Sequence, residues 1–490
     1  MKRIIYFLIV ISLLGCSEFL DEQPISNMSL GEFYETEVHF EQAMNGAYKT
    51  LHGVYSGESG RGAVSNFSEI RSDNSTYQYN PVHQGWYEIW DIDKFLVVSS
   101  NQAVRWTWNA TYQGIGTCNL ILHFLEDKDF ENKNRIEAEA KFLRALYYFH
   151  LVKNFGDIPL VTTKVESMEE AFSLNKRTPK ELVYDQILSD LNFSKEYLPL
   201  NYSGNLIGKA TRGAAKTLLA KVLMWKDDYS GAVKELEEII NENQYSLLNE
   251  YENVFDINNE NNEEIIFSVQ YLEGPYGLAS IFMYNFLPYN IGKDKLPFQN
   301  GDNFGINIPT EDLINSFEEN DQRLKMIDTS FVFKGYEHLG VYKGSIVPFS
   351  LKFNDMGHSQ RMNTGTNFNV FRYPHVLLML AECYLRVGGG DPVPLVNSVR
   401  NRAGLDDLNN VTLDDIIHER RVEFHCEDDR WDVLVRTGKV FEIMKAHGER
   451  EKNRRSDFSN DSFEEIKILL PIPSTVIERD PTIQQNEEYL

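Results

Sequence analysis

The chain has 490 residues, of which 42% are hydrophobic and 12% aromatic, and its formal net charge is −25. This length is enough for one large domain or for two or three ordinary ones. The acidic balance argues against nucleic acid as a partner, because phosphates require a basic surface, and it also disfavours a polyanionic ligand.

The N-terminus has the organisation of an export signal. Two basic residues precede an apolar run over 4–14, which is shorter than the roughly 20 residues that a membrane-spanning helix needs. The segment Leu-Leu-Gly-Cys that ends at Cys16 resembles the lipobox of bacterial lipoproteins, in which the cysteine is acylated. We therefore predict a signal peptide over 1–15, a lipid anchor at Cys16, and a polar tether within 16–34.

Cysteine usage is sparse. If Cys16 is acylated, only Cys118, Cys383 and Cys426 remain, and the sequence has no Cys-x-x-Cys spacing. An odd number of thiols cannot pair completely. We therefore expect the fold to be held by its core rather than by disulfides or structural zinc.

The segment 138–161 predicts a helix that is buried on two sides. One stripe of apolar residues follows a 4-3-4-3 spacing, and a second stripe runs beside it. Neighbouring helices must cover both stripes, as in a layered helical array. The first stripe comprises Ala138, Phe142, Ala145, Phe149 and Val152, and the second comprises Ala140, Leu143 and Tyr147.

Further helices follow at short intervals. Thr178 as N-cap, Pro179 at the first helical position and Glu181 two residues later predict a helix through Tyr197. The next helices cover 214–223, which has paired alanine and aliphatic positions, and 229–243. Helices of this length with short connections suggest tetratricopeptide-like hairpins.

Helical periodicity lapses between residues 247 and 365. Asn, Gly, Tyr and Phe become frequent there, and only 264–270 predicts a clear strand. Long irregular segments in compact proteins are usually functional or disordered, and the aromatic content argues against disorder. Helices are predicted again over 370–385 and 413–445. The expected fold class is mainly α, with an irregular lobe that contains a few short strands.

Motifs for catalysis or metal binding are incomplete. His418-Glu419 begins like a zinc-protease helix, but the second histidine is missing, and the charges of 418–426 favour a solvated, salt-bridged face. Residues 256–262 begin like a calcium loop without its glycine or its final glutamate. The sequence has no GxSxG motif and no phosphate-binding loop. We therefore predict no catalytic residue, cofactor or metal.

Aromatic residues form two clusters that suit a sugar ligand, because the apolar faces of sugar rings stack on flat aromatic rings. The alternative is that these aromatics are core residues. The first cluster lies in a polar, turn-rich stretch and the second in the irregular lobe. The residues predicted to contact ligand are Asn74, Tyr77, Tyr79, Trp86, Trp90, Tyr276, Tyr284 and Tyr289, with Tyr87, Phe282 and Phe286 nearby.

Several segments resemble motifs of the SusD/RagB family of nutrient-binding lipoproteins. Asp428, where the family often has glycine, and Asp432 depart from its pattern, and we expect these changes to affect only a surface contact. The matching segments are AEAKFLRALYYFHLVKNFGDIPLV at 138–161, Asp321-x-Arg323, RYPHVLLMLAECYL at 372–385, NSVRNRAGL at 397–405, IIHERRVEFHCEDDRWDVLVRTGK at 416–439 and LLPIPSTVIERDPTIQQN at 469–486.

The resemblance implies a helical scaffold in two parts, over 35–246 and 366–490, with a ligand-binding lobe over 247–365. It also implies a non-catalytic outer-membrane lipoprotein at the cell surface. Such a protein captures an oligosaccharide and passes it to a SusC-like, TonB-dependent transporter. Two alternatives stay open at this point: a peptide-capturing relative and a surface glycoside hydrolase.

Overall fold

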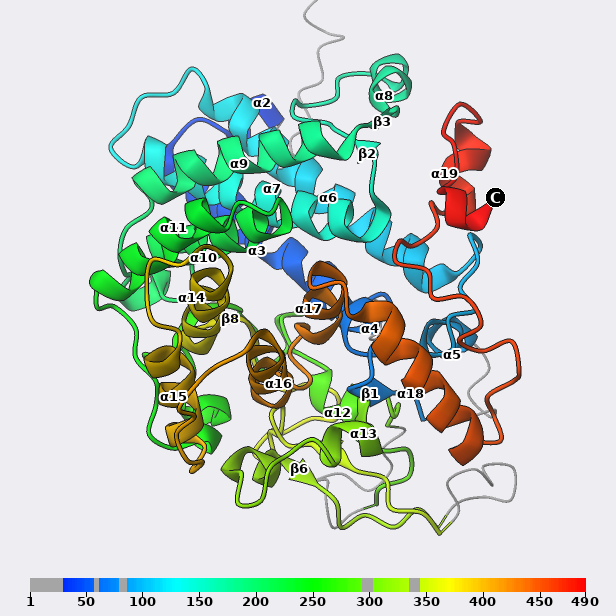
Figure 1. Ribbon diagram of the computed structural model, residues 1–490. Helices are drawn as coiled ribbons and strands as arrows, with labels where there is room; N and C mark the ends of the chain where they lie inside the picture. The colour runs from blue at the N-terminus through cyan, green and yellow to red at the C-terminus, as the bar shows by residue number, and fades with distance from the viewer. Residues whose placement is uncertain (1–29, 57–60, 79–85, 293–302, 335–343) are drawn as a thin grey trace, which may run out of the picture.

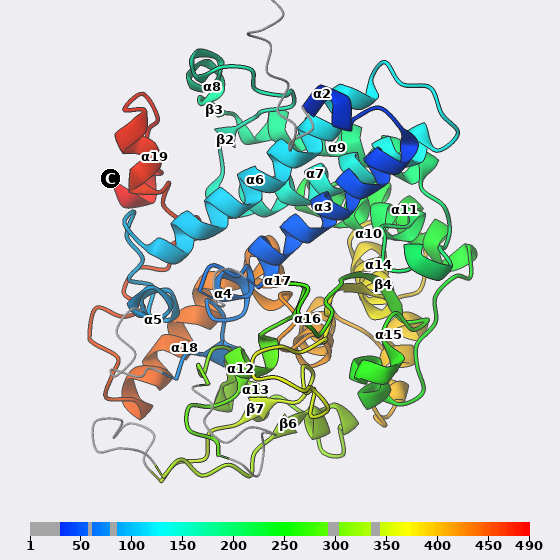
Figure 2. The ribbon, with the colours of Figure 1, turned by 180° about the vertical axis from the view of Figure 1, so that it is seen from behind.

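Helices dominate the computed structural model, which describes residues 30–56, 61–78, 86–292, 303–334 and 344–490. The signal peptide, Cys16 and Tyr79 lie outside these ranges. Long helices from the first half of the chain form one end of the molecule, and the irregular lobe lies at the other (Figures 1 and 2). The C-terminal helices lie between and beside them. The expected mainly helical fold is confirmed.

The described elements are mostly helical, and every strand pairs with only one partner. The helices are α2 (Leu30–Phe33), α3 (Glu37–Tyr55), α4 (Ser65–Ser68), α5 (Tyr87–Asp93), α6 (Gln102–Leu125), α7 (Lys133–Phe155), α8 (Met168–Leu174), α9 (Lys180–Tyr197), α10 (Arg212–Trp225), α11 (Tyr229–Asn241), α12 (Phe282–Phe286), α13 (Glu311–Ile314), α14 (Tyr373–Val387), α15 (Val393–Arg402), α16 (Leu413–Glu423), α17 (Arg430–Arg436), α18 (Val440–Arg454) and α19 (Ser474–Arg479). The strands are β1 (Ser75–Thr76), β2 (Ile158–Pro159), β3 (Arg177–Thr178), β4 (Ile265–Val269), β5 (Ile308–Pro309), β6 (Ile327–Asp328), β7 (Phe349–Ser350) and β8 (Phe368–Arg372).

The long helices stack in chain order: α3 on α6, α6 on α7, α7 on α9, α9 on α10, and α10 on α11. The helix α7 is buried on both sides, as its two apolar stripes predict. Close approach of α6 and α7 depends on Gly114, where an added Cβ would lie 2.5 Å from the Tyr147 ring. Packing of paired helix faces, rather than helix propensity, therefore stabilises this scaffold.

The start of α9 differs from the prediction. Thr178 belongs to β3 and pairs with Ile158 of β2, so Pro179 takes the N-cap position and the helix begins at Lys180. Asp157 replaces the expected threonine cap, because its carboxylate accepts the main-chain N–H of Lys180 at 2.9 Å. The strand pairing thus displaces the helix start by one residue.

The strand predicted at 264–270 is confirmed as β4. It pairs antiparallel with β8, with Ile265 opposite Arg372 and Val269 opposite Phe368. Residues 370–372 are therefore extended rather than helical, and α14 starts only at Tyr373, where Pro374 fits the first turn. The strand pair crosses the proposed boundary at residue 365, and the division into 35–246, 247–365 and 366–490 stays a prediction.

The helix predicted over 413–445 is divided into α16, α17 and part of α18. Cys426 and Asp428 have φ values of +65° and +66° in the turn after α16, and Gly438, at φ +73°, separates α17 from α18. Left-handed backbone of this kind interrupts a helix. The turn directs several charged side chains inward instead of along one solvated helix.

The prediction of a solvated face over 418–426 is wrong, because most of this segment is buried in an ionic junction between the lobe and the C-terminal helices. Arg372 binds Glu264 at 2.6 Å, Glu423 at 2.9 Å and Glu427 at 2.6 Å. Its partners come from the residue before β4, from α16 and from the turn after α16. The junction comprises Glu264, Asp321, Arg323, Lys352, Arg372, Arg402, Glu419, Glu423 and Glu427.

Charge compensation is nearly complete within this ionic junction. Arg323 donates to Asp321 from Nη2 at 2.8 Å and from Nε at 2.9 Å, which accounts for the Asp-x-Arg element. Burial alone would raise the pKa of Glu423, but Arg402, Arg372 and Arg323 outweigh it and hold that pKa far below its usual value. Apart from the local pair Asp321–Arg323, the buried charges of the junction depend on partners that lie far away in the sequence.

Cys118, Cys383 and Cys426 are all buried and unpaired. Burial raises the pKa of both the Cys118 and the Cys383 thiols to about 12, and it also raises that of Cys426. Among the helices of the described ranges, none is both long and apolar enough to cross a bilayer.

Candidate functional site

The two predicted aromatic clusters are joined by short β-pairing. β1 and β5 pair antiparallel, with Ser75 opposite Pro309. Gln78 then donates its main-chain N–H to Gly305 at 2.8 Å, and its side-chain oxygen accepts the N–H of Tyr289 at 2.7 Å. Residues about 200 positions apart are therefore brought to one side of the molecule, beside α5 and α12 (Figure 1).

Trp86 is part of a tryptophan–arginine cluster that also contains Arg61, Trp106 and Phe304. The Trp86 ring stacks on Phe304 with a centroid distance of 4.7 Å and an angle of 24°. The Arg61 guanidinium lies 5.3 Å from the Trp86 ring and 4.6 Å from the Trp106 ring. Sequence reasoning missed both residues: Arg61 lies in a stretch of small residues without aromatics, and Trp106, although close to Trp108 and Tyr112, follows the predicted cluster and belongs to α6.

The helix α5 presents two further rings. Trp90 donates from its indole nitrogen to Asp457 at 3.3 Å, and the Lys94 ammonium lies 3.1 Å from its ring centroid. Tyr87 meets Trp90 at 62° with centroids 6.2 Å apart, and the side chain of Tyr87 is 47% exposed. Asn101 fixes the helix by donating from its side chain to the Glu88 carbonyl at 3.0 Å.

Burial shifts the pKa values of several titratable groups on and beside α5. Burial raises the pKa of Asp91 to about 6 and also raises that of Glu88. It lowers the pKa of Lys94 to about 8. Glu88 faces Arg61 at 3.6 Å. The arrangement therefore offers flat rings, a guanidinium and carboxylates at one surface, which suits a neutral polar ligand with apolar faces.

Four predicted contact residues are buried, so their assignment to the ligand surface needs correction. Trp86 is 9% exposed and packs in the hydrophobic core. Asn74 is 1% exposed and accepts the Arg421 Nε–H at 2.9 Å. The Tyr77 ring lies in the core. The Tyr284 hydroxyl pairs with His358 at 2.6 Å inside the lobe. Pairing of β1 with β5 buries Asn74 and Tyr77, and large aromatic rings are more often core than ligand contacts.

The remaining predicted residues occupy different places. Tyr276 is 65% exposed on a turn closed by the Leu272–Leu278 bridge, and the adjacent Gly277 approaches Lys49 of α3. Tyr289 is half-buried near Ile308. Phe282 and Phe286 are buried core residues. The candidate ligand surface therefore comprises Arg61, Tyr87, Trp90, Trp106 and Phe304, with Trp86 buried beneath it, while contacts from Tyr276 and Tyr289 stay predictions.

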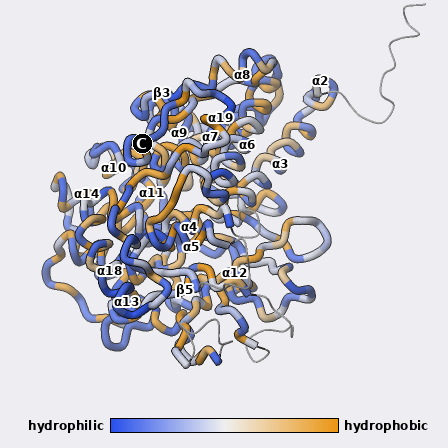
Figure 3. Tube along the Cα trace, turned by 90° about the vertical axis from the view of Figure 1, so that its right-hand side faces the viewer, coloured by the Kyte–Doolittle hydropathy of each residue, from blue (hydrophilic) through white to orange (hydrophobic). Residues whose placement is uncertain are grey.

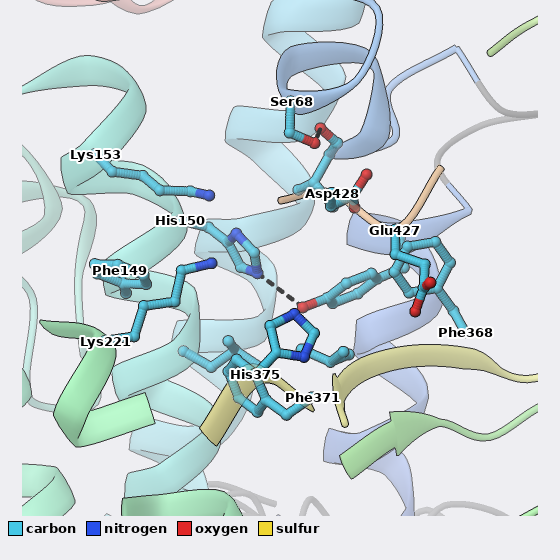
Figure 4. Close-up of a pocket in the computed structure, with 14 residues that line it drawn as sticks. Ser68, Phe149, His150, Lys153, Lys221, Phe368, Phe371, His375, Glu427 and Asp428 are labelled. Atoms are coloured by element: carbon cyan, nitrogen blue, oxygen red, sulfur yellow. Dashed lines mark hydrogen bonds between the residues drawn. The ribbon is translucent and has the colours of Figure 1, made fainter. Parts of the chain in front are cut away.

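A separate cavity lies inside the scaffold between α7, α10 and β8 (Figure 4). Its volume of about 30 Å³ holds one or two water molecules but no sugar ring. Tyr55 and His150 share a hydrogen bond of 2.9 Å across it. Burial lowers the pKa of His150 and that of His375 well below the usual value, so both rings are neutral.

Asp428 and Asp432 lie around this cavity and not at the surface, contrary to the expectation from the family pattern. Asp432 binds Lys153 at 2.7 Å and Lys221 at 2.9 Å. Neither oxygen of Asp428 accepts a hydrogen bond of normal geometry from the described residues, although Ser68 lies beside it (Figure 4). Burial raises the pKa of Asp428 to about 7.

Glu69, which lies close to Asp428 in space, has a pKa that is raised further still. Glu69 accepts the main-chain N–H groups of Asp429 at 3.3 Å and Cys426 at 3.4 Å. Burial, with the negative charges of Asp428 and Asp429, raises the pKa of Glu69 to about 8. No group of three or more metal-ligating side chains occurs among residues 30–490 outside the undescribed gaps.

Comparisons with known proteins agree on one family. A model described as "Starch-binding associating with outer membrane" matches residues 18–224, and a model described as "SusD family" matches residues 342–489. The SusD-like protein P25 of Formosa agariphila is 28% identical over 99% of this chain and 98% of its own.

Solved structures share the fold over nearly the whole chain. Surface glycan-binding protein A from Bacteroides uniformis has a TM-score of 0.78 at 24% identity and covers 92% of this chain and 99% of its own. The surface glycan-binding protein A from Bacteroides thetaiotaomicron, in complex with laminarihexaose, has a TM-score of 0.75 at 25% identity, over 92% and 100%. The motifs at both ends of the sequence and these matches lead to one conclusion: the chain belongs to the SusD/RagB family.

Proposed function

We propose that this protein captures a neutral oligosaccharide on the surface formed by α5 and the tryptophan–arginine cluster, and that it does not cleave the sugar. The observation that supports this most is the pair of rings on seven-residue α5, the exposed Tyr87 and the half-buried Trp90. A relative of similar fold is described in complex with laminarihexaose, and one matching family model is described as starch-binding.

Stacking and hydrogen bonding both contribute to recognition of the sugar. The faces of Tyr87 and Trp90 accept the apolar side of a sugar ring, and Arg61 and Glu88 at the same surface bind hydroxyl groups. The Arg61 guanidinium is held between two indoles, so little rotamer freedom is lost when a ligand binds. The surface is thus largely pre-formed.

The carboxylates near the rings support capture rather than hydrolysis. Glu88 faces Arg61, and Asp457 accepts from Trp90 and from Arg455 at 2.7 Å. A glycosidase needs one carboxylic acid and one carboxylate placed on opposite sides of a scissile bond. Carboxylates that are engaged by cations and indoles are poorly suited to that task.

We place the protein at the outer membrane, where an acylated Cys16 anchors it and a TonB-dependent transporter receives the ligand. Confinement to the membrane raises the effective concentration of the binder at its transporter. A Cys16→Ser protein is expected to lose mature, membrane-bound material in fractionation. A C-terminally tagged chain, extracted in mild detergent, is expected to recover a large outer-membrane barrel protein; recovery of the binder alone contradicts the partner.

Calorimetry with the full chain tests the ligand class. Laminarihexaose, maltohexaose and a neutral hexapeptide are titrated separately, and binding of either sugar but not of the peptide is the expected result. Tyr87→Ala is expected to weaken sugar binding by roughly 1–3 kcal/mol, the loss seen when an interface aromatic is truncated.

Tyr197→Ala is the matched control, because Tyr197 is also an exposed tyrosine but lies at the end of α9. Equal losses in both variants would contradict the site. Shortened sugar products, released by the purified chain and detected by chromatography, would overturn the proposal that it does not cleave. Binding of the peptide alone would favour a peptide-capturing protein.

A further inference from the structure

A short amphipathic helix lies apart from the ligand surface. None of the seven residues of α8 is buried. Met168 and Phe172, four positions apart and therefore on one helix face, are 74% and 49% exposed. Glu169 and Glu170 lie on the other faces. A single solvent-exposed face with two large apolar side chains is a typical docking surface.

Tertiary packing does not account for the order of α8. A helix of this length is unstable alone in water. Ser167 caps its start by accepting the Glu170 N–H at 3.1 Å, and Asn175 after its end reaches Asp480 at 3.4 Å. These polar contacts hold the two ends, while the apolar face between them is left open.

The position of α8 indicates what covers this face. Figures 1, 2 and 3 show α8 and α2 at the same end of the molecule. The described chain starts in α2 at Leu30, 14 positions after the proposed anchor at Cys16. Such a segment spans at most roughly 50 Å. Val38, in the first turn of α3 and close after α2, is also 63% exposed.

We infer that α8 docks on the lipid surface of the membrane, with Met168 and Phe172 inserted among the acyl chains. This inference rests on the proposed anchoring at Cys16, because the tether keeps this end of the molecule within reach of lipid. Helices with one apolar face lie in the membrane interface in this way, and a second contact strengthens an acyl anchor. Docking at α8 would restrict the orientation of the ligand surface, which the tether alone does not.

A depth-sensitive label tests the docking. Phe172→Cys, in the full lipidated chain, is labelled with an environment-sensitive fluorophore and reconstituted in phosphatidylcholine vesicles that contain acyl-chain spin labels. Phe441→Cys is the control, because Phe441 is equally large and exposed but lies on α18, away from α8 in Figure 1. We expect at least twofold stronger quenching at position 172 than at position 441.

The outcomes separate the anchor from the docking. Protein that floats with the vesicles but shows equal quenching at both positions overturns the docking and leaves the anchor intact. Protein that does not float overturns both. A label at position 172 that is shielded from water but unquenched by lipid would mean that a protein surface covers α8, and this result also overturns the inference.

Discussion

The ionic junction and the ligand surface both contain clusters of charges and rings, yet they differ in how tightly each residue is fixed. Arg372 is fully buried and is held by three carboxylates, whereas Tyr87 is 47% exposed and packs its ring edge-on against Trp90. A change in the junction therefore leaves other buried charges with too few partners, while a change at the surface mainly removes the contacts of the replaced side chain. Stability and ligand affinity are thus determined in separate places.

The largest expected effect comes from breaking the junction. Arg372→Met leaves Glu264, Glu423 and Glu427 without their central cation, and unpaired buried charges cost roughly 3–5 kcal/mol. Chemical denaturation should show this loss in the free energy of unfolding. Arg386→Met is the control, because Arg386 is partly exposed and its contact with Glu382 is long, at 3.9 Å. We expect this variant to change the free energy of unfolding by less than about 1 kcal/mol.

A pH-dependent effect is expected at Asp428. Its folded-state pKa of about 7 lies above the ordinary value of 3.8, so the folded chain binds this proton more tightly than the unfolded chain. The resulting stability is complete below about pH 4 and is lost as the pH rises to 7. Asp428→Asn removes this loss. On going from pH 4 to pH 8, the variant should therefore gain on the order of 2–4 kcal/mol in free energy of unfolding relative to wild type.

Denaturation at both pH values measures this gain. Asp185→Asn is the matched control on the exposed side of α9. A gain at Asp428 that is equal at pH 4 and pH 8 would contradict a buried, titrating carboxyl. Because the charge of Asp428 also helps to raise the pKa of Glu69, the measured gain reports the two neighbouring carboxyls together.

The smallest effect is expected within the ligand surface. Arg61→Met removes the cation between Trp86 and Trp106 and should weaken hexasaccharide binding by roughly 0.5–1 kcal/mol, about two- to fivefold. Calorimetry measures it, and the thermal midpoint should stay unchanged. Arg479→Met on α19 is the control; a fall in the midpoint of the Arg61 variant without a change in affinity would mean that Arg61 is structural.

Sequence patterns predict most of the scaffold because helix packing repeats locally. The two stripes of α7 are visible within 20 residues, and β4 is bounded by turn residues. The local sequence pattern does not predict the burial of 418–426. Its mixed charges favour solvent exposure, but Arg323 and Arg372, distant in sequence, pair with its glutamates in the core.

The candidate site is less predictable for a related reason. Trp86 and Trp90 were identified from composition, but Asn74 and Tyr77 are buried by β-pairing with residues more than 200 positions away. Arg61 gives no local signal, and the aromatic run around Trp106 does not reveal that Arg61 connects it with Trp86 in the folded chain. Exposure at an irregular surface depends on such long-range pairs, and periodicity does not encode them.

The burial of the three thiols determines how the folded protein responds to oxidants and reductants. Thiolate is the form that reacts with oxidants and disulfides, and the raised pKa values of Cys118 and Cys383 leave almost none at neutral pH. Once folded, this part of the chain is therefore redox-inert. Its maturation should not depend on disulfide-forming enzymes, and neither an oxidising nor a reducing habitat should alter its stability.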